Sequence, residues 1–255
     1  MKNLSVTIVQ ADLHWENPVA NLAMLEELLW GIKEKTDLII LPEMFTTGFS
    51  MKTSLAEHTG LTTLRWLRQQ AAQRGAVITG SYMVKENDKF YNRLAWVDAD
   101  GYVDYYDKGH LFSMADEHQF FTAGNKTLVK TVKGWRISPF ICYDLRFPTW
   151  SYNIEKQAIK YDCLLYVANF PEVRANVWNT LLRARAIENW SYCIGVNRVG
   201  IDGKGISYVG ESAVINAKGN TIFEAGNQVC VQTIELNWAE LQEYRAKFPA
   251  YVDVK

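Results

Sequence analysis

Residues 37–43, DLIILPE, form a continuous apolar run that ends at a proline and a glutamate. Such a run is typical of a short β-strand that is buried on both faces, as in a sheet covered by helices. Glu43 then lies at the carboxyl end of the strand, where open α/β folds place their functional sites. The stretch therefore predicts an α/β fold and makes Glu43 a candidate functional residue.

The segments around this strand alternate between short strands and amphipathic helices. A strand is predicted at Leu4–Val9, and a helix begins at Asn17-Pro18 because proline is tolerated in a first helical turn. A second helix is predicted over Leu61–Arg74 and ends at Gly75, a residue suited to a helix C-cap. Further strands are predicted at Val77–Val84, Tyr91–Val97 and Tyr102–Tyr106.

The second half of the chain repeats this alternation. Strands are predicted at Trp135–Cys142, Cys163–Asn169, Tyr192–Val196, Ser212–Ile215, Thr221–Glu224 and Val229–Ile234. Helices are predicted at Pro148–Lys160, Val173–Trp190 and Trp238–Phe248, and the glycine-rich stretch Gly200–Gly210 is interpreted as a loop. No low-complexity linker separates the halves, so the sequence predicts one α/β domain over residues 1–255 with two similar halves.

The composition excludes several classes of protein. The chain has 255 residues, of which 48% are hydrophobic, and this is too apolar for a disordered protein. Its 27 Lys+Arg and 28 Asp+Glu give a net charge of −1, without the basic excess that nucleic-acid binding needs. No apolar run approaches the ~20 residues of a membrane span, and the N-terminus lacks the pattern of a secretory signal. We therefore expect a cytoplasmic globular protein that binds neither nucleic acid nor membranes.

The cysteines are far apart in the sequence, at Cys142, Cys163, Cys193 and Cys230. No C-x-x-C pair or Cys/His cluster is present, which argues against a zinc site and a redox dithiol. The last three cysteines lie in apolar strands and are interpreted as core residues. Cys142 instead ends a strand and is followed by polar residues. It is therefore either a buried strand-end residue or a reactive thiol near a helix N-terminus.

Lys108 also ends a predicted strand, so three strand ends carry groups that can act together. A cysteine with a pKa of ~8.5 is only partly ionised at neutral pH and needs a base or a cation. Glu43 can supply the base, and Lys108 can supply the cation that holds an oxyanion. Taken singly, Glu43 is better explained as a solvated loop acid and Lys108 as a surface lysine beside Asp107, but their joint appearance with Cys142 at three strand ends favours a functional role. The alternative catalytic pair is Cys142 with His110 or His118.

Three motifs occur in this order at the three strand ends: LPEMF (41–45), YDKGHLF (106–112) and ICYDLRFP (141–148). Together they closely resemble the nitrilase, or carbon–nitrogen hydrolase, superfamily. Supporting matches are Asn169-Phe170-Pro171, ARAIEN (184–189) and Gly210-Glu211-Ser212, so the resemblance covers about Leu4 to Phe248. Within the superfamily the chain looks most like the omega-amidase branch, through CYDLRFP, MADEH (114–118) and EYRAKFPA (243–250).

The resemblance implies a four-layer αββα sandwich that usually forms a homodimer or a higher homo-oligomer. It also implies a catalytic triad of Glu43, Lys108 and Cys142, with Glu117 as a second glutamate that orients Lys108 or the substrate. No metal or organic cofactor is implied, because side chains and backbone supply every reacting group.

The same resemblance assigns groups that contact the substrate. The oxyanion of the reaction is expected on the Lys108 ammonium and the backbone N–H of Tyr143. Asn169 and Phe170, which follow the next strand, are expected to bind the substrate.

The omega-amidase likeness implies a thiol hydrolase that cleaves a small acid amide through a cysteine thioester. The expected substrate is 2-oxoglutaramate or 2-oxosuccinamate, and the products are the 2-oxo acid and ammonia. Its carboxylate needs a cation, for which Arg146 is the first candidate and Arg185 and Arg198 are others, unless Arg146 pairs with Asp144. Open alternatives are the same triad acting on a nitrile, an N-carbamoyl amine or another amide, and a non-catalytic binding scaffold.

Overall fold

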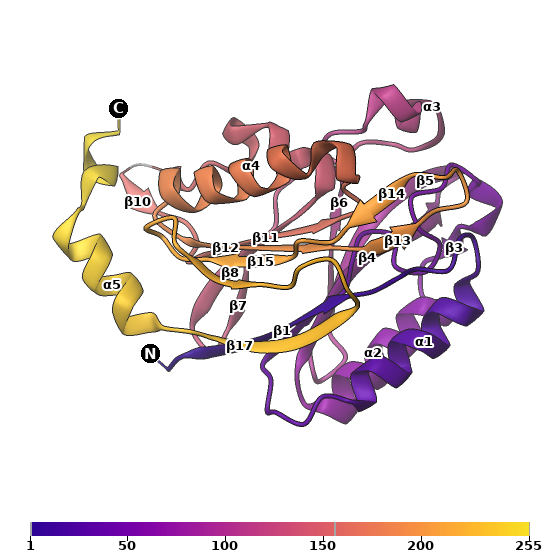
Figure 1. Cartoon of the computed structure of the whole chain (residues 1–255), viewed down its shortest axis with the longest axis horizontal. Helices are drawn as coiled ribbons and strands as arrows, with labels where there is room; N and C mark the ends of the chain where they lie inside the picture. The colour runs from indigo at the N-terminus through magenta and orange to yellow at the C-terminus, as the bar shows by residue number, and fades with distance from the viewer. Residues whose placement is uncertain (1, 156, 255) are drawn as a thin grey trace.

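The computed structural model describes residues 2–155 and 157–254. Two β-sheets lie face to face, and helices cover their outer faces, so the layers follow the order α, β, β, α (Figure 1). Helices α1 (Pro18–Trp30) and α2 (Thr62–Arg74) cover the first sheet, and α4 (Ala175–Glu188) covers the second. Helix α5 (Trp238–Lys247) packs at one end of the sandwich. The predicted fold class, an αββα sandwich, is confirmed.

The first sheet has the strand order β17-β1-β2-β4-β5-β6, and β3 pairs with β4. Its strands are β1 (Leu4–Gln10), β2 (Leu38–Ile40), β3 (Glu57–His58), β4 (Val77–Glu86), β5 (Lys89–Val97), β6 (Val103–Asp107) and β17 (Cys230–Leu236). Strand β2 explains the apolar run from which the fold was predicted. Leu38 and Ile40 face the core between the sheets, whereas Ile39 faces the core under α1 and α2, because successive side chains of a strand point to opposite faces.

The second sheet repeats this arrangement in the order β16-β15-β12-β11-β8-β7. Its strands are β7 (Lys130–Val132), β8 (Trp135–Ile141), β11 (Cys163–Ala168), β12 (Tyr192–Asn197), β15 (Ala213–Ile215) and β16 (Thr221–Glu224). In both sheets, three parallel strands have antiparallel strands on either side: β1, β2 and β4 in the first, and β8, β11 and β12 in the second. The chain therefore consists of two similar halves, as predicted, whereas the single domain over residues 1–255 stays a prediction.

Most predicted helices and strands are confirmed within a few residues. The side chain of Asn17 accepts a hydrogen bond from the backbone of Ala20 at the start of α1, and Gly75 ends α2 with a φ of 60°. Strands β3 and β7 were not predicted. Among the described residues, no helix is long and apolar enough to span a membrane.

The predicted helix over Pro148–Lys160 is wrong. This segment contains the 3-10 turn Pro148–Ser151 and a small hairpin of β9 (Ile154–Glu155) and β10 (Ala158–Ile159). The Asn153 side chain accepts hydrogen bonds from the backbone N–H groups of Lys160 and Tyr161 and donates one to the carbonyl of Tyr161. These bonds close the segment into a loop, since a short polar side chain competes with helical backbone bonds.

The predicted loop over Gly200–Gly210 is also wrong in part. The segment forms a hairpin of β13 (Val199–Ile201) and β14 (Ser207–Val209). Val199 pairs with Asp12, just after the end of β1. The side chain of Asp202 accepts hydrogen bonds from the backbone N–H groups of Lys204 and Ile206 and so fixes the turn.

The remaining short elements lie in connections. Helix α3 spans Glu117–Phe120, and 3-10 turns span Thr53–Leu55, Ser113–Ala115, Cys142–Arg146, Glu172–Arg174 and Ala250–Asp253. The turns at Cys142–Arg146 and Glu172–Arg174 follow the carboxyl ends of β8 and β11, which puts them at the same edge of the second sheet.

Candidate active site

Glu43 follows β2 and is completely buried. One of its carboxylate oxygens, Oε2, accepts a hydrogen bond of 2.8 Å from the backbone N–H of Asn169, the residue after β11. The next residue, Met44, has a positive φ of 43°, and its backbone N–H donates to the hydroxyl of Ser81. The turn after β2 is therefore held from both sheets, and it fixes the direction of the Glu43 side chain.

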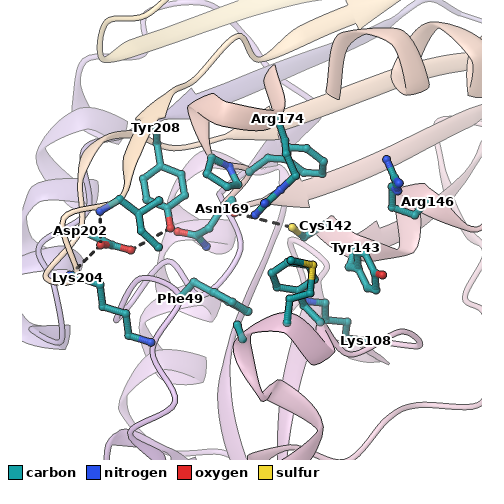
Figure 2. A pocket seen from close by; sticks show the side chains of 16 residues that line it. Phe49, Lys108, Cys142, Tyr143, Arg146, Asn169, Arg174, Asp202, Lys204 and Tyr208 are labelled. Carbon is teal, nitrogen blue, oxygen red and sulfur yellow. Dashed lines mark hydrogen bonds between the residues drawn. The ribbon is translucent and has the colours of Figure 1, made fainter. Parts of the chain in front are cut away.

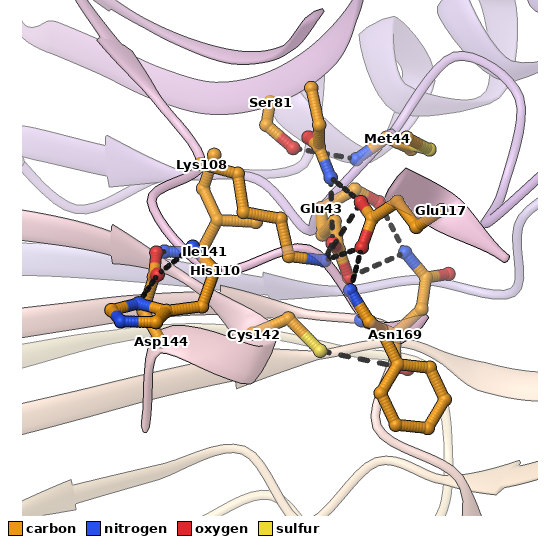
Figure 3. A network of polar contacts seen from close by, with 12 residues as sticks. Glu43, Met44, Ser81, Lys108, His110, Glu117, Ile141, Cys142, Asp144 and Asn169 are labelled. Atoms are coloured by element: carbon orange, nitrogen blue, oxygen red, sulfur yellow. Dashed lines mark hydrogen bonds and ion pairs between the residues drawn. The ribbon is translucent and has the colours of Figure 1, made fainter. Parts of the chain in front are cut away.

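Lys108 follows β6 and lies at the centre of a buried network of polar groups (Figure 3). Its ammonium Nζ is 2.9 Å from Glu43 Oε1 and 2.9 Å from Glu117 Oε2. The side-chain amide of Asn92 on β5 donates to the same Oε1 of Glu43 at 2.8 Å. Each charged group thus has a partner of opposite charge, as buried charges require.

Glu117 begins helix α3 and is also completely buried. Besides Lys108, its Oε2 atom accepts a hydrogen bond of 2.6 Å from the backbone N–H of Phe112. This bond closes the loop between Lys108 and α3. The structure therefore brings both predicted glutamates onto one ammonium group, and Glu117 is held by its own loop.

Cys142 lies directly after β8 with a φ of 44°, in the left-handed region that non-glycine residues rarely adopt. Its Sγ atom is 3.9 Å from the backbone carbonyl oxygen of Asn169. Burial raises the pKa of the Cys142 thiol well above its usual value, and the carboxylate of Glu43 raises it further. The resting thiol is therefore protonated, and an attack by sulfur requires a base.

Asp144 holds the turn that carries Cys142. Its Oδ2 atom accepts hydrogen bonds from the Tyr106 hydroxyl at 2.6 Å and from the Ile141 backbone at 3.1 Å. Its Oδ1 atom lies 2.8 Å from both the backbone nitrogen and the ring Nδ1 of His110. The His110 ring stacks on Phe147, with the ring centroids 3.8 Å apart. His110 therefore packs as a hydrogen-bonded residue under the turn.

The charges of the network depend on one another. Burial alone would lower the pKa of Lys108, but the carboxylates of Glu117 and Glu43 together raise it above its usual value. Lys108 consequently stays an ammonium ion. Burial raises the pKa of Glu117, and the nearby Lys108 opposes this effect. Because the groups titrate together, proton uptake belongs to the cluster as a whole.

A cavity of about 170 Å³ opens above this network (Figure 2). Its lining comprises Phe49, Lys108, Phe112, Met114, Ala115, Cys142, Tyr143, Arg146, Asn169, Phe170, Pro171, Arg174, Asp202, Lys204, Ile206 and Tyr208. Six of the predicted site residues are among them: Lys108, Cys142, Tyr143, Arg146, Asn169 and Phe170. Glu43 and Glu117 lie behind Lys108, and among the described residues neither His110 nor His118 belongs to the lining.

The predicted arginines occupy different environments. Arg146 lines the cavity but is exposed, and it does not pair with Asp144, whose partners are Tyr106, Ile141 and His110. Arg185 is buried on α4 and pairs with Glu188, 2.8 Å away. Arg198 is buried and pairs with Asp12, 3.1 Å away. Neither Arg185 nor Arg198 is among the described residues that line the cavity.

Sequence reasoning missed four polar residues of the lining. Arg174 ends the 3-10 turn before α4, and Asp202, Lys204 and Tyr208 come from the β13–β14 hairpin. The hydroxyl of Tyr208 donates to Asp202 Oδ2 at 3.0 Å. A signal for Arg174 was available, because a cation at the N-terminus of a helix opposes the helix dipole and calls for another explanation. The hairpin residues gave no such signal.

The family follows from comparison with known proteins. Residues 5–246 match the family model described as carbon–nitrogen hydrolase, and the chain therefore belongs to the carbon–nitrogen hydrolase family. Members of this family cleave carbon–nitrogen bonds other than peptide bonds, and the protein is an enzyme of that class.

The relatives are similar over almost their whole length. The chain is 44% identical to the omega-amidase YafV of Escherichia coli K12, over 99% of this chain and 97% of that protein. It is 30% identical to the 2-oxoglutaramate amidase of Bacillus subtilis, over 98% and 97%. The structure of XC1258 from Xanthomonas campestris, a CN-hydrolase superfamily protein with an arsenic adduct in its active site, matches with a TM-score of 0.98. It is 43% identical and covers 100% of this chain and 98% of that one. The chain thus belongs to the omega-amidase-like branch.

Proposed function

We propose that this enzyme hydrolyses a small acid amide of the 2-oxoglutaramate type to the 2-oxo acid and ammonia, with Cys142 as the nucleophile. The observation that carries the proposal is the buried cluster of Glu43, Lys108 and Glu117 behind the cysteine at the end of the cavity. The names of the similar relatives, an omega-amidase and a 2-oxoglutaramate amidase, support this substrate class.

The first step is attack by sulfur on the amide carbon. Glu43 accepts the thiol proton as the bond between Sγ and the carbonyl carbon forms. The carbonyl oxygen becomes an oxyanion, which the Lys108 ammonium and the backbone N–H of Tyr143 stabilise. Glu117 keeps Lys108 in place, because it holds the ammonium through two oxygens at 3.0 and 2.9 Å.

In the second step the carbon–nitrogen bond breaks and a thioester remains on Cys142. The proton that Glu43 accepted goes to the departing nitrogen, which leaves as ammonia. Glu43 then takes a proton from a water molecule, and the resulting hydroxide attacks the thioester. The acid product leaves, and Glu43 returns the proton it took from water to the sulfur of Cys142. Glu43 therefore acts as base and acid in the first half of the cycle and again in the second.

The proposal is tested by a trapped intermediate and a panel of substrates. Mass spectrometry of the enzyme during turnover of a slow amide should detect an acyl adduct on the peptide that contains Cys142. The Cys142→Ala variant serves as the control and should show no adduct. Ammonia release should be fastest with acid amides and slower with nitriles, N-carbamoyl amines and neutral amides. An adduct on another residue, or no hydrolysis of any amide, would refute the proposal.

We also propose that the enzyme acts as a cytoplasmic homodimer. The resemblance to the superfamily suggests this assembly, and two exposed apolar side chains offer a surface for it, Val173 just before α4 and Ile187 on α4. Light scattering on the purified protein measures the mass directly, and a monomer mass at micromolar concentration would contradict the proposal.

A further inference from the structure

The cavity lining carries an excess of positive charge. Four cations face it, Lys108, Arg146, Arg174 and Lys204, against one acid, Asp202. Lys108 is balanced by the two glutamates behind it. Asp202 is occupied by hydrogen bonds from Tyr208 and from the backbone of its own hairpin. The outer part of the cavity is therefore suited to an anionic group on the substrate.

Arg174 is the cation that is held in position inside this space. Its guanidinium carbon lies 5.2 Å from the centre of the Phe112 ring, another residue of the lining. In Figure 2 its side chain points into the cavity toward Asn169 and Cys142, whereas Arg146 points away from Cys142. Arg174 is half-buried, while Lys204 and Arg146 are exposed. A half-buried guanidinium on an aromatic face loses little further freedom when it binds a carboxylate.

The guanidinium of Arg174 has no acidic partner among the described residues. The arginines that form ion pairs there are Arg93, Arg136, Arg185, Arg198 and Arg245. Arg174 also stands at the N-terminus of α4, where the helix dipole disfavours a cation. An arginine in this position is explained if it binds an anion that enters the cavity.

We propose that Arg174 binds the carboxylate of the acid amide and so sets the specificity of the enzyme for anionic substrates. This inference rests on the proposed function, because it assumes that the amide end of the substrate lies at Cys142. The planar guanidinium can hold a carboxylate through two parallel hydrogen bonds. The substrate then spans the cavity, with its amide at the buried cluster and its carboxylate at the start of α4.

The test compares Arg174→Ala with the wild type on two substrates, an acid amide and a neutral amide of equal chain length. We expect kcat/KM for the acid amide to fall about ten- to a hundredfold, mainly through KM, because a hydrogen bond to a charged group is lost. Activity on the neutral amide should stay within about twofold. Arg183→Ala, on the same helix but away from the cavity lining, is the matched control and should leave both activities unchanged.

Two further arms separate the possible failures. Arg146→Ala should cost less than Arg174→Ala on the acid amide, and a selective loss in Arg146→Ala alone would overturn the inference. Calorimetry with 2-oxoglutarate, as a product-like anion, measures binding without turnover in Cys142→Ala. Binding should weaken about ten- to a hundredfold when Arg174→Ala is added. Equal binding by the two proteins refutes the role of Arg174 even if the enzyme proves to hydrolyse other substrates.

Discussion

The two halves of the molecule place their three parallel strands in the same order but connect the first two of these strands differently. In the first half, α1 joins β1 to β2 and packs on the outer face of the sheet. In the second half, the connection from β8 to β11 contains two 3-10 turns and the β9–β10 hairpin, with no α-helix among its described residues. The second connection begins at Cys142, so the half that lacks this helix is the half that presents the candidate nucleophile.

The difference begins at equivalent residues. Ala11 follows β1 as Cys142 follows β8, and each strand has seven residues. Ala11 is buried and is not among the described residues with positive φ, whereas Cys142 has a φ of 44°. A positive φ costs a non-glycine residue about 1–2 kcal/mol, and such strain persists only where the surroundings enforce it. The two halves therefore differ at the sharp turn of Cys142 and not in the strand before it, and this turn presents the candidate thiol to the cavity.

Removing the sulfur should have the largest effect on activity. Cys142→Ala removes the proposed nucleophile, so we expect the amidase rate to fall roughly 10⁴-fold or more. Circular dichroism and size-exclusion chromatography should show an unchanged fold, because Cys142 lies at the cavity and leaves little space behind. A variant that keeps a tenth of the wild-type rate would show that the second connection does not carry the nucleophile.

The base is tested by a pair of variants, Glu43→Gln and His110→Asn. Glu43→Gln removes a proton acceptor while keeping the shape of the side chain, and kcat should fall about 10²–10⁴-fold. His110→Asn should retain at least about a tenth of the activity, since His110 contacts Asp144 and is not part of the described cavity lining. Steady-state kinetics of the two variants measure both losses of kcat. A larger loss in His110→Asn than in Glu43→Gln would favour a Cys–His pair.

The elements with local signals could be predicted from the sequence. The run before Glu43 is apolar because its strand is buried on both faces. Asn17 caps the start of α1, and Gly75 caps the end of α2. Glu43, Lys108 and Cys142 could be named as candidates because each follows a predicted strand, whereas the other site residues were named from the family resemblance. Their meeting point could not be derived from the residues alone, because the contact between Glu43 and Asn169 joins positions far apart in the chain.

The errors occur where distant contacts decide the structure. The predicted helix over Pro148–Lys160 fails because Asn153 binds the backbone of its own loop and that of Asn189, the residue that ends α4. The β13–β14 hairpin is not predicted, because the glycines of residues 200–210 favour a loop. Its base is fixed by a backbone bond from Val199 to Ala11, which the sequence does not reveal. The unusual place of Arg174 at a helix N-terminus is visible in the sequence, but its contact with Phe112 at the cavity arises only in the folded chain.

The turn itself is tested by Asp144→Asn. The carboxylate accepts four hydrogen bonds through two oxygens, and an amide replaces one acceptor by a donor. Buried donors left without an acceptor should cost about 1–3 kcal/mol of unfolding free energy. We also expect kcat to fall while KM changes little, because the turn carries Cys142. Denaturant unfolding and kinetics measure both effects. Wild-type stability together with wild-type kcat would show that Asp144 does not hold the turn.

The smallest expected effect is the change in unfolding free energy when glycine replaces the residue at each of the two equivalent positions, Cys142 and Ala11. Glycine adopts positive φ without the penalty of a Cβ atom, so Cys142→Gly should be more stable than Cys142→Ala by about 0.5–1 kcal/mol. At Ala11 the same change, Ala11→Gly, should lower the unfolding free energy by about 0.5–1 kcal/mol, because glycine there gains nothing in the folded state and loses more entropy on folding. Chemical denaturation of the four proteins, wild type included, gives both differences.

If glycine is more stable than alanine at position 142 and less stable than alanine at position 11, the backbone strain belongs to the turn of the second half and is absent from the first. If glycine destabilises both positions, the positive φ at Cys142 carries no penalty. The contrast between the halves would then lie in the side chains alone, with Asp144 and the buried glutamates directing the thiol without help from the backbone. Because both variants at position 142 lack the sulfur, the comparison measures conformation separately from chemistry.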